Sequence, residues 1–261
     1  MNAEIGSRMP GARVATAPRT NGEVLDATFK LGRTGFVRML PYAILTSLVS
    51  AAPFVYLLNA YADVLVDPAA TLRFMFSWRS WLLGLVMTVL AMLIYGASIV
   101  RMESIAQGAD VGIGPSFGAT LPRLPGLVGA MFGYVLAVLV GCALLLFPGI
   151  YLAGALFLFV PAIVLDGQGA IGSLGHSYQL VLGNWWRVAT IAGVALILLY
   201  LVYIVIGVLV GLFMGFRGSE LSFVIAVDLV SSLVGGLLTA PFLAALCVEM
   251  YREVKIRKRI A

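Results

Sequence analysis

The chain has 261 residues, of which 61% are hydrophobic and only 11% are charged. In soluble globular domains about a quarter of all residues are charged. The composition therefore excludes an ordinary water-soluble domain and indicates a protein surrounded by lipid. The net charge of +5 is modest, and we expect no nucleic-acid partner.

The first segment, residues 1–22, has no apolar core. It is therefore not a secretory signal peptide, and its composition predicts a disordered cytoplasmic tail. We expect a membrane domain over residues 23–250, followed by a basic cytoplasmic tail over residues 251–261.

Uncharged, mostly apolar runs recur along the chain, and each can cross the bilayer hydrocarbon, which needs about 20 residues. The run 124–165 would form a helix about twice as long as the bilayer is thick, so it must fold back. Pro148 and Gly149 are the predicted turn, because proline lacks a backbone donor and glycine permits the backbone of a reversal. Pro161 is expected to kink the second helix of this pair.

The sequence thus predicts an all-α, polytopic membrane protein with six transmembrane helices arranged as three hairpins. The predicted spans are residues 39–62, 80–100, 125–147, 150–166, 188–216 and 221–248. Of the 17 Lys and Arg residues, all except Arg73, Arg79 and Arg217 fall on the side of the two termini. Because cytoplasmic loops carry the excess of basic residues, we expect both termini in the cytoplasm. The terminal basic clusters set this topology, or they also rest against anionic lipid head groups.

Three segments on the cytoplasmic side, 25–39, 117–131 and 174–188, align without gaps and carry apolar residues on one helical face. The opposite face is polar in the first and third segments, which predicts amphipathic helices in the head-group plane. The middle segment contains two prolines and is expected to be a short helix or turn. Each segment precedes a pair of spans, a pattern that either duplication or convergence explains.

The third segment ends in Trp185, Trp186 and Arg187, which are typical anchors at the membrane interface. His176 lies on its polar face. A histidine changes its charge near neutral pH, so His176 is either a pH sensor or a solvated side chain.

Two stretches resemble a known group of proteins: LLFPGIYLAGALFLFVPAIVLDGQGAIGSLGHSYQLVLGNWWR and the ending PFLAALCVEMYREVKIRKR. They are similar to bacterial six-helix membrane proteins, which include the YciC-like uncharacterised proteins and the membrane domain associated with glycerophosphodiester phosphodiesterases. The resemblance covers most of the chain from about residue 24. It implies a six-helix fold in the bacterial inner membrane but no established activity. The phosphodiesterase chemistry belongs to a separate soluble domain, which we do not expect in this chain.

Asp228 is the acidic residue that lies well inside a predicted span, with Ser231 and Ser232 one turn away. Ionisable groups in hydrocarbon usually face the bundle interior or water, so these residues are the candidate polar site for an ion, a proton or a polar substrate. The alternative is that Asp228 lies near the outer interface. The sequence contains no catalytic motif, cofactor-binding motif or metal-ligand spacing, and we expect no cofactor.

Small residues at helical spacing indicate close contacts between helices. Gly129 and Gly133 form one GxxxG motif, and Gly207, Gly211 and Gly215 form two in tandem. These motifs favour packing within the monomer, and a homo-oligomer is the other interpretation.

The leading hypothesis is a non-enzymatic protein that scaffolds or maintains the inner membrane, with membrane lipids as partners. The alternative is a small transporter or channel for a lipid or small solute that uses Asp228. A tightly packed apolar core would favour the first hypothesis, and a continuous polar cavity would favour the second. An intramembrane enzyme ranks last, because no catalytic constellation is visible.

Overall fold

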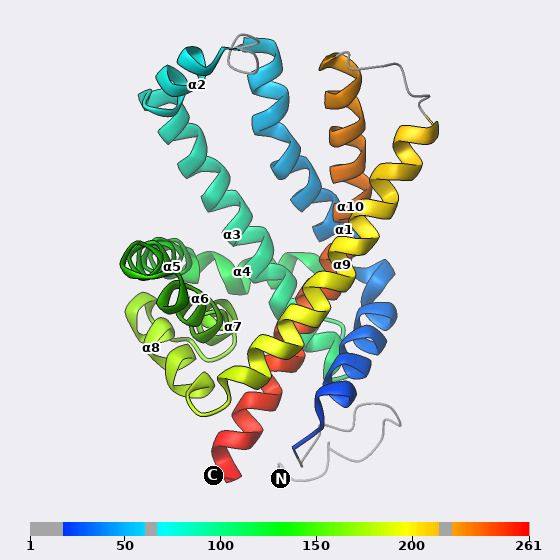
Figure 1. Cartoon of the computed structure of the whole chain (residues 1–261). Coiled ribbons are helices and arrows are strands. Elements are labelled where there is room, and N and C mark those ends of the chain that lie inside the picture. The colour runs from blue at the N-terminus through cyan, green and yellow to red at the C-terminus, as the bar shows by residue number, and fades with distance from the viewer. Residues whose placement is uncertain (1–17, 61–66, 214–220, 261) are drawn as a thin grey trace.

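The computed structural model describes residues 18–60, 67–213 and 221–260, which form helices and turns and no strand (Figure 1). Six helical stretches within this described part are long and apolar enough to cross a membrane. The elements are α1 (Asn21–Ala60), α2 (Pro68–Met75), α3 (Trp78–Ala106), α4 (Ile113–Thr120), the 3₁₀ turn η2 (Leu121–Arg123), α5 (Leu124–Leu144), α6 (Leu146–Ala155), α7 (Phe159–Val164), α8 (Ala170–Val181), α9 (Trp185–Phe213) and α10 (Leu221–Ile260).

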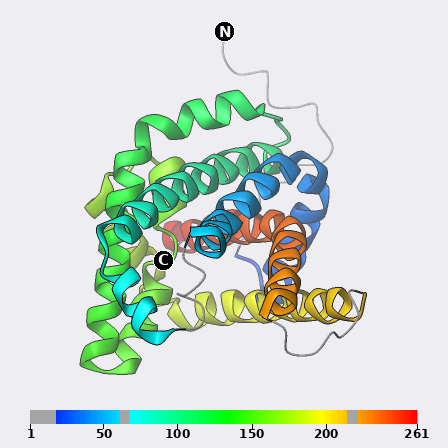
Figure 2. The ribbon, with the colours of Figure 1, turned by 90° about the horizontal axis from the view of Figure 1, so that it is seen from above.

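Four long helices, α1, α3, α9 and α10, run along the length of the molecule, whereas Figure 1 looks nearly along the axis of α5. The pair formed by α5 and α6 therefore lies crosswise to the long helices (Figure 2). Several helices that follow each other in the sequence contact each other, such as α5 with α6 and α9 with α10, but the most extensive contact joins α1 to α10. The first and last helices of the described chain thus pack together, and the arrangement as three hairpins stays a prediction.

The first predicted amphipathic segment is part of α1 rather than a separate helix, since residues 25–39 continue without a break into the apolar stretch. Its buried face, which includes Thr28 and Met39, packs inside the molecule. Gly32 permits the close approach of α10, because a Cβ atom at this position would lie 2.5 Å from the ring of Phe242. A face that α10 covers cannot rest on head groups, which explains the difference from the predicted interfacial helix.

The other two amphipathic segments fold differently from each other. The middle one forms the end of α4, η2 and the start of α5, in agreement with its two prolines. The third one forms most of α8 and the start of α9, and Gly183, with a φ of +85°, lies in the turn between these two helices. Helix α8 packs against α5, α7 and α10, so protein rather than lipid covers its buried face.

The turn between α5 and α6 lies at Leu145, whose backbone is extended, and not at Pro148 and Gly149 as predicted. Both of these residues lie in the first turn of α6. Proline is tolerated there because the N–H groups of a first turn have no partner within the helix. Gly149 is needed for another reason: a Cβ atom on it would lie 2.1 Å from Sγ of Cys142, so only glycine lets α6 pack this closely on α5.

The second helix of this pair is interrupted before Pro161, as expected, and forms α6 and α7. Pro161 has no N–H for the carbonyl of Phe157, and its ring would clash with that group in a continuous helix. Ser177 of α8 bridges the interruption. Its Oγ donates to the carbonyl of Ala155 at 2.9 Å and accepts from the N–H of Leu158 at 3.1 Å.

Large apolar side chains cover much of the outer surface of the long helices and of α5. They include Leu85, Leu139, Leu201, Leu209 and Phe213, all of them exposed. So much exposed apolar surface is unsuited to water and suited to lipid. The distribution agrees with a multi-pass membrane protein.

Candidate functional site

Two carboxylates are buried at one end of the molecule, called here the charged end. This end holds the start of α1, the ends of α3 and α10, α8 and the start of α9 (Figure 1). Glu253 is 1% exposed and Glu249 is 7% exposed, although carboxylates are seldom buried unless they are paired. Both lie on the face of α10 that also carries the buried Leu246, Met250 and Val254, because residues three, four and seven positions apart share a helical face.

Glu253 is the centre of an ionic cluster that we call the clasp, formed by Arg19, Arg187, Glu249, Glu253 and Arg257. Its Oε1 lies 2.7 Å from Nε of Arg257 and 3.6 Å from Nη2 of Arg187. The backbone N–H of Arg19 also donates to Oε1, at 3.1 Å. Three segments that are distant in sequence therefore meet at one buried carboxylate.

Arg19 completes the clasp through both its side chain and its backbone. Its Nη2 lies 2.7 Å from Oε2 of Glu249, and its carbonyl accepts hydrogen bonds from Arg187 and Arg257. The residues just before α1 are thus fixed between α9 and α10.

A second ion pair joins the end of α3 to α10. Arg252 binds Glu103 with two parallel hydrogen bonds, from Nε to Oε2 at 2.9 Å and from Nη2 to Oε1 at 2.7 Å. Two parallel bonds of this kind are among the stronger ionic contacts in proteins. Nη1 of Arg252 lies 3.8 Å from Oε1 of Glu249, so this pair adjoins the clasp.

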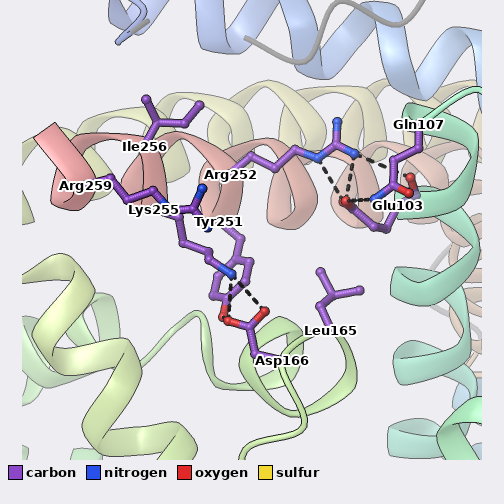
Figure 3. A pocket seen from close by; sticks show the side chains of 9 residues that line it. All are labelled: Glu103, Gln107, Leu165, Asp166, Tyr251, Arg252, Lys255, Ile256 and Arg259. Carbon is purple, nitrogen blue, oxygen red and sulfur yellow. Dashed lines mark hydrogen bonds and ion pairs between the residues drawn. The ribbon is translucent and has the colours of Figure 1, made fainter. Parts of the chain in front are cut away.

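Asp166 forms the third group, in the turn after α7 (Figure 3). Tyr251 donates from its hydroxyl to Oδ2 at 2.5 Å, and Nζ of Lys255 lies 2.8 Å from both carboxylate oxygens. His176 of α8 approaches from another side, with Nε2 at 3.7 Å from Oδ2. The two sequence stretches that carry the family resemblance therefore bind each other through Asp166 of the first and Tyr251 and Lys255 of the second.

A pocket of about 390 Å³ lies between the Glu103–Arg252 pair and the Asp166 group, and Figure 3 shows its side chains. It is lined by Glu103, Gln107, Leu165, Asp166, Tyr251, Arg252, Lys255, Ile256 and Arg259. Both carboxylates in the pocket already bind cations, so the arrangement is suited to holding helices together and poorly suited to proton transfer. Among the described residues, no three His, Cys, Asp or Glu side chains are grouped so that they could hold a metal ion.

The pKa of Asp166 is shifted by opposing causes. Partial burial raises it, but the hydrogen bonds from Lys255 and Tyr251 and the positive charge nearby lower it by more, so the pKa lies below its usual value. An Asp with a lowered pKa stabilises the fold above its unfolded pKa of about 3.9, and this contribution is lost as the pH falls through the lower folded value.

We expect Asp166→Asn to be less stable than the natural protein at pH 7, by about 1 kcal/mol for a partly exposed ion pair. The difference between the two proteins should shrink as the pH falls below about 4, where the carboxyl of the natural protein becomes neutral. Thermal unfolding in a neutral detergent, followed between pH 7 and pH 3, measures it. A difference that stays constant over this range would contradict the assigned role of Asp166.

The structure places the four predicted interfacial residues in different environments. Trp185 is packed on α6, where its Nε1 donates to the carbonyl of Tyr151 at 2.9 Å, whereas Trp186 is 80% exposed. Arg187 belongs to the clasp, and His176 belongs to the Asp166 group. The charged end thus brings together two of these four residues, and Trp186 remains available as an interface anchor.

The predicted polar site on α10 is only partly described. Asp228 lies within α10, but its side chain is outside the described part of the structure. The Oγ of Ser231 is buried and has no hydrogen-bond partner among the described atoms. Ser232 shares a hydrogen bond of 3.3 Å with the hydroxyl of Tyr203 on α9.

Sequence reasoning missed Glu103, Glu249 and Glu253, which read as ordinary surface charges paired with their neighbours. The i,i+4 pairing of Glu253 with Arg257 is present, but Glu103 pairs with Arg252 rather than with the nearby Arg101. The apolar periodicity of α10 could have indicated that Glu249 and Glu253 are buried. Both share a helical face with apolar residues, and this face continues beyond the last predicted span.

A family model described as a domain of unknown function, DUF7847, matches residues 75–254. No curated protein and no solved structure matches the chain. The resemblance to YciC-like proteins and to the phosphodiesterase-associated membrane domain stays a prediction.

Proposed function

Because the chain belongs to the DUF7847 family, a domain of unknown function, we propose a role for it from its own residues: a non-enzymatic scaffold that maintains the bacterial inner membrane. Its partners are membrane lipids. The charged end faces the cytoplasm, since the side that carries most Lys and Arg residues stays inside.

The observation that carries this proposal is where the buried polar groups lie. At the charged end, buried Glu249 and Glu253 are neutralised by arginines of the same chain. Towards the other end the helices touch through small residues: a Cβ atom on Gly235 would lie 2.7 Å from the ring of Tyr203, and one on Gly236 would lie 2.6 Å from Oγ of Ser47. Because α10 is in close contact with both α9 and α1, a packed scaffold is favoured over a water-filled transport path between these helices.

The GxxxG motifs support the same interpretation. Gly133 packs on Leu174 of α8, and Gly207 and Gly211 face Ser231 and Val227 of α10. The Gly129–Gly133 motif and the Gly207–Gly211 motif are thus used for contacts inside one chain, whereas Gly215 lies outside the described residues. A homo-oligomer stays a second prediction, one that these glycines do not require.

Transport along a path lined by α10 is the second candidate function, and the observation that favours it is the buried hydroxyl of Ser231, which has no hydrogen-bond partner among the described atoms. The two functions differ in what they require of Asp228. A transporter of this kind needs the carboxylate of Asp228 in its path, whereas a scaffold needs only the packing of α10.

Complementation separates the two functions. With the host's own copy deleted, the cells receive the natural gene, Asp228→Asn or an empty vector, and leakage of a cytoplasmic enzyme reports the integrity of the inner membrane. We expect the empty vector to raise leakage severalfold, and both protein variants to restore the barrier at equal protein levels in the membrane. Failure of Asp228→Asn at a normal protein level would favour transport, and no defect in the deletion strain would contradict the scaffold.

A further inference from the structure

Arg38 of α1 and Arg101 of α3 share a single carboxylate at the boundary of the charged end. Nε of Arg38 lies 3.5 Å from Oδ2 of Asp110, and Nη2 of Arg101 lies 3.4 Å from Oδ1. Two positive charges thus meet one negative charge, across contacts that are long for charge-assisted hydrogen bonds.

Arg101 is only 8% exposed, yet its Nε and Nη1 have no hydrogen-bond partner among the described atoms. The hydroxyl of Tyr42 is also buried and has no hydrogen-bond partner in the described part of the chain, and Cζ of Arg101 lies 5.8 Å from the centre of the Tyr42 ring. A buried guanidinium that uses one of its three nitrogens costs free energy, because the N–H groups gave up water without receiving an acceptor.

Both arginines lie where apolar chain meets charged chain. The uncharged run of α1 begins directly after Arg38, and the uncharged run of α3 ends directly before Arg101. The two helices are in contact at this level, since a Cβ atom on Gly35 would lie 3.3 Å from Sδ of Met102. In a membrane protein, this boundary is the depth of the lipid head groups.

Asp110 reaches the two arginines from the turn that follows α3. Helix α3 ends at Ala106, Gly108 follows with a φ of +78°, and the N–H of Ala109 donates to the carbonyl of Ser104 at 2.9 Å. The N–H of Val111 donates to Oγ of Ser104, which fixes the backbone on the far side of Asp110. The backbone is therefore held at both sides, while the Asp110 side chain is 42% exposed and the Arg38 side chain is 50% exposed.

We propose that Arg38 and Arg101 bind a phosphate group at head-group depth, and that the Asp110 carboxylate occupies this place in the structure. A phosphate carries more acceptor oxygens than a carboxylate, and planar guanidinium groups bind it with paired hydrogen bonds. The phosphate belongs to a membrane phospholipid or to a soluble phosphate ester, and the depth of the site favours the lipid. The site rests on the proposed membrane location and not on the scaffold role.

The test uses the full-length protein in a neutral detergent, titrated with short-chain phosphatidylglycerol. Diacylglycerol with the same chains serves as a probe without phosphate, and glycerol phosphate serves as the soluble competitor. Native mass spectrometry counts the bound molecules and gives the dissociation constant. The variants are Asp110→Asn, Arg38→Gln and Arg101→Gln, and Arg33→Gln is the matched control, since it removes the same charge from an exposed position on α1.

We expect Asp110→Asn to bind phosphatidylglycerol about tenfold more tightly, and Arg38→Gln about tenfold more weakly, the size of one charged hydrogen bond. Arg33→Gln should change binding by less than about threefold, and diacylglycerol should not bind. Competition by glycerol phosphate at the lipid's own concentration would assign the phosphate to a soluble ester, and absence of competition assigns it to a lipid.

Equal weakening by Arg33→Gln and Arg38→Gln, or unchanged binding in Asp110→Asn, would overturn the site. Arg38→Gln and Asp110→Asn change exposed side chains, so the test holds even where the variant of the buried Arg101, Arg101→Gln, fails to fold. Fractionation of cells tests the membrane location separately, which distinguishes failure of this site from failure of the proposed function.

Discussion

Glu253→Gln is expected to destabilise the folded protein by about 3–5 kcal/mol, the cost of removing one partner from a buried ion pair. The side chain of Glu253 is 1% exposed and forms ion pairs with the side chains of Arg19, Arg187 and Arg257. It also accepts a hydrogen bond from the backbone N–H of Arg19. Glutamine keeps the size of the side chain and removes its charge. The arginines of the clasp would then repel each other, with only Glu249 to balance them.

Thermal unfolding in a neutral detergent measures this loss, and Asp67→Asn is the matched control. Asp67 pairs with Arg73 at 3.5 Å, and both side chains are well exposed, so the control should lose less than about 1 kcal/mol. Asparagine still accepts the hydrogen bond that begins α2. If Glu253→Gln is no less stable than Asp67→Asn, the clasp does not hold the bundle together.

Gly149→Ala is expected to be as damaging, although it adds a single methyl group. The new Cβ atom would lie 2.1 Å from Sγ and 2.7 Å from the backbone nitrogen of Cys142, and a backbone atom of a packed helix cannot move aside. Helix α6 must then separate from α5. Overpacking of this kind costs typically 1–3 kcal/mol where side chains can adjust, and we expect about 3 kcal/mol or more here.

The control is Gly193→Ala on α9, where a Cβ atom would meet no atom within 4 Å. Alanine favours a helix over glycine, so this control should be neutral or slightly stabilising. Protease sensitivity of the α5–α6 turn in detergent reports the separation directly. A Gly149→Ala protein that matches Gly193→Ala in stability and in protease resistance would show that the two helices do not pack as described.

The positions of the apolar helices could be predicted from the sequence, because a bilayer requires about 20 apolar residues per span and charges mark where each run ends. The kink at Pro161 could also be predicted, because the missing N–H of a proline removes a hydrogen bond within its own helix. Leu145 could not. Nothing local distinguishes it from the leucines beside it, and the position of the turn depends on where Gly149 must face Cys142.

The apolar periodicity of α10 could indicate a buried face at Glu249 and Glu253, but the partners of these two carboxylates could not be predicted from the sequence, for a related reason. Glu249 and Glu253 have basic neighbours one turn away, so pairing along the helix surface explains them without any burial. Their burial arises from Arg19 and Arg187, which come from the start of α1 and of α9. Side chains so distant in sequence meet only once the helices are arranged, and neither spacing nor periodicity records that arrangement.

The pairing of α1 with α10 also sets the order of events while the protein is made. Arg19 and Glu253 are 234 positions apart, so the ribosome has translated nearly all of the helices before these two residues can meet. Until α10 is inserted, the face of α1 that later packs on α10 must be in contact with lipid or with the insertion machinery. Emergence of the last helix is therefore the step that completes the assembly. A nascent chain that stops before it leaves Arg19 and Arg187 without their counter-charge.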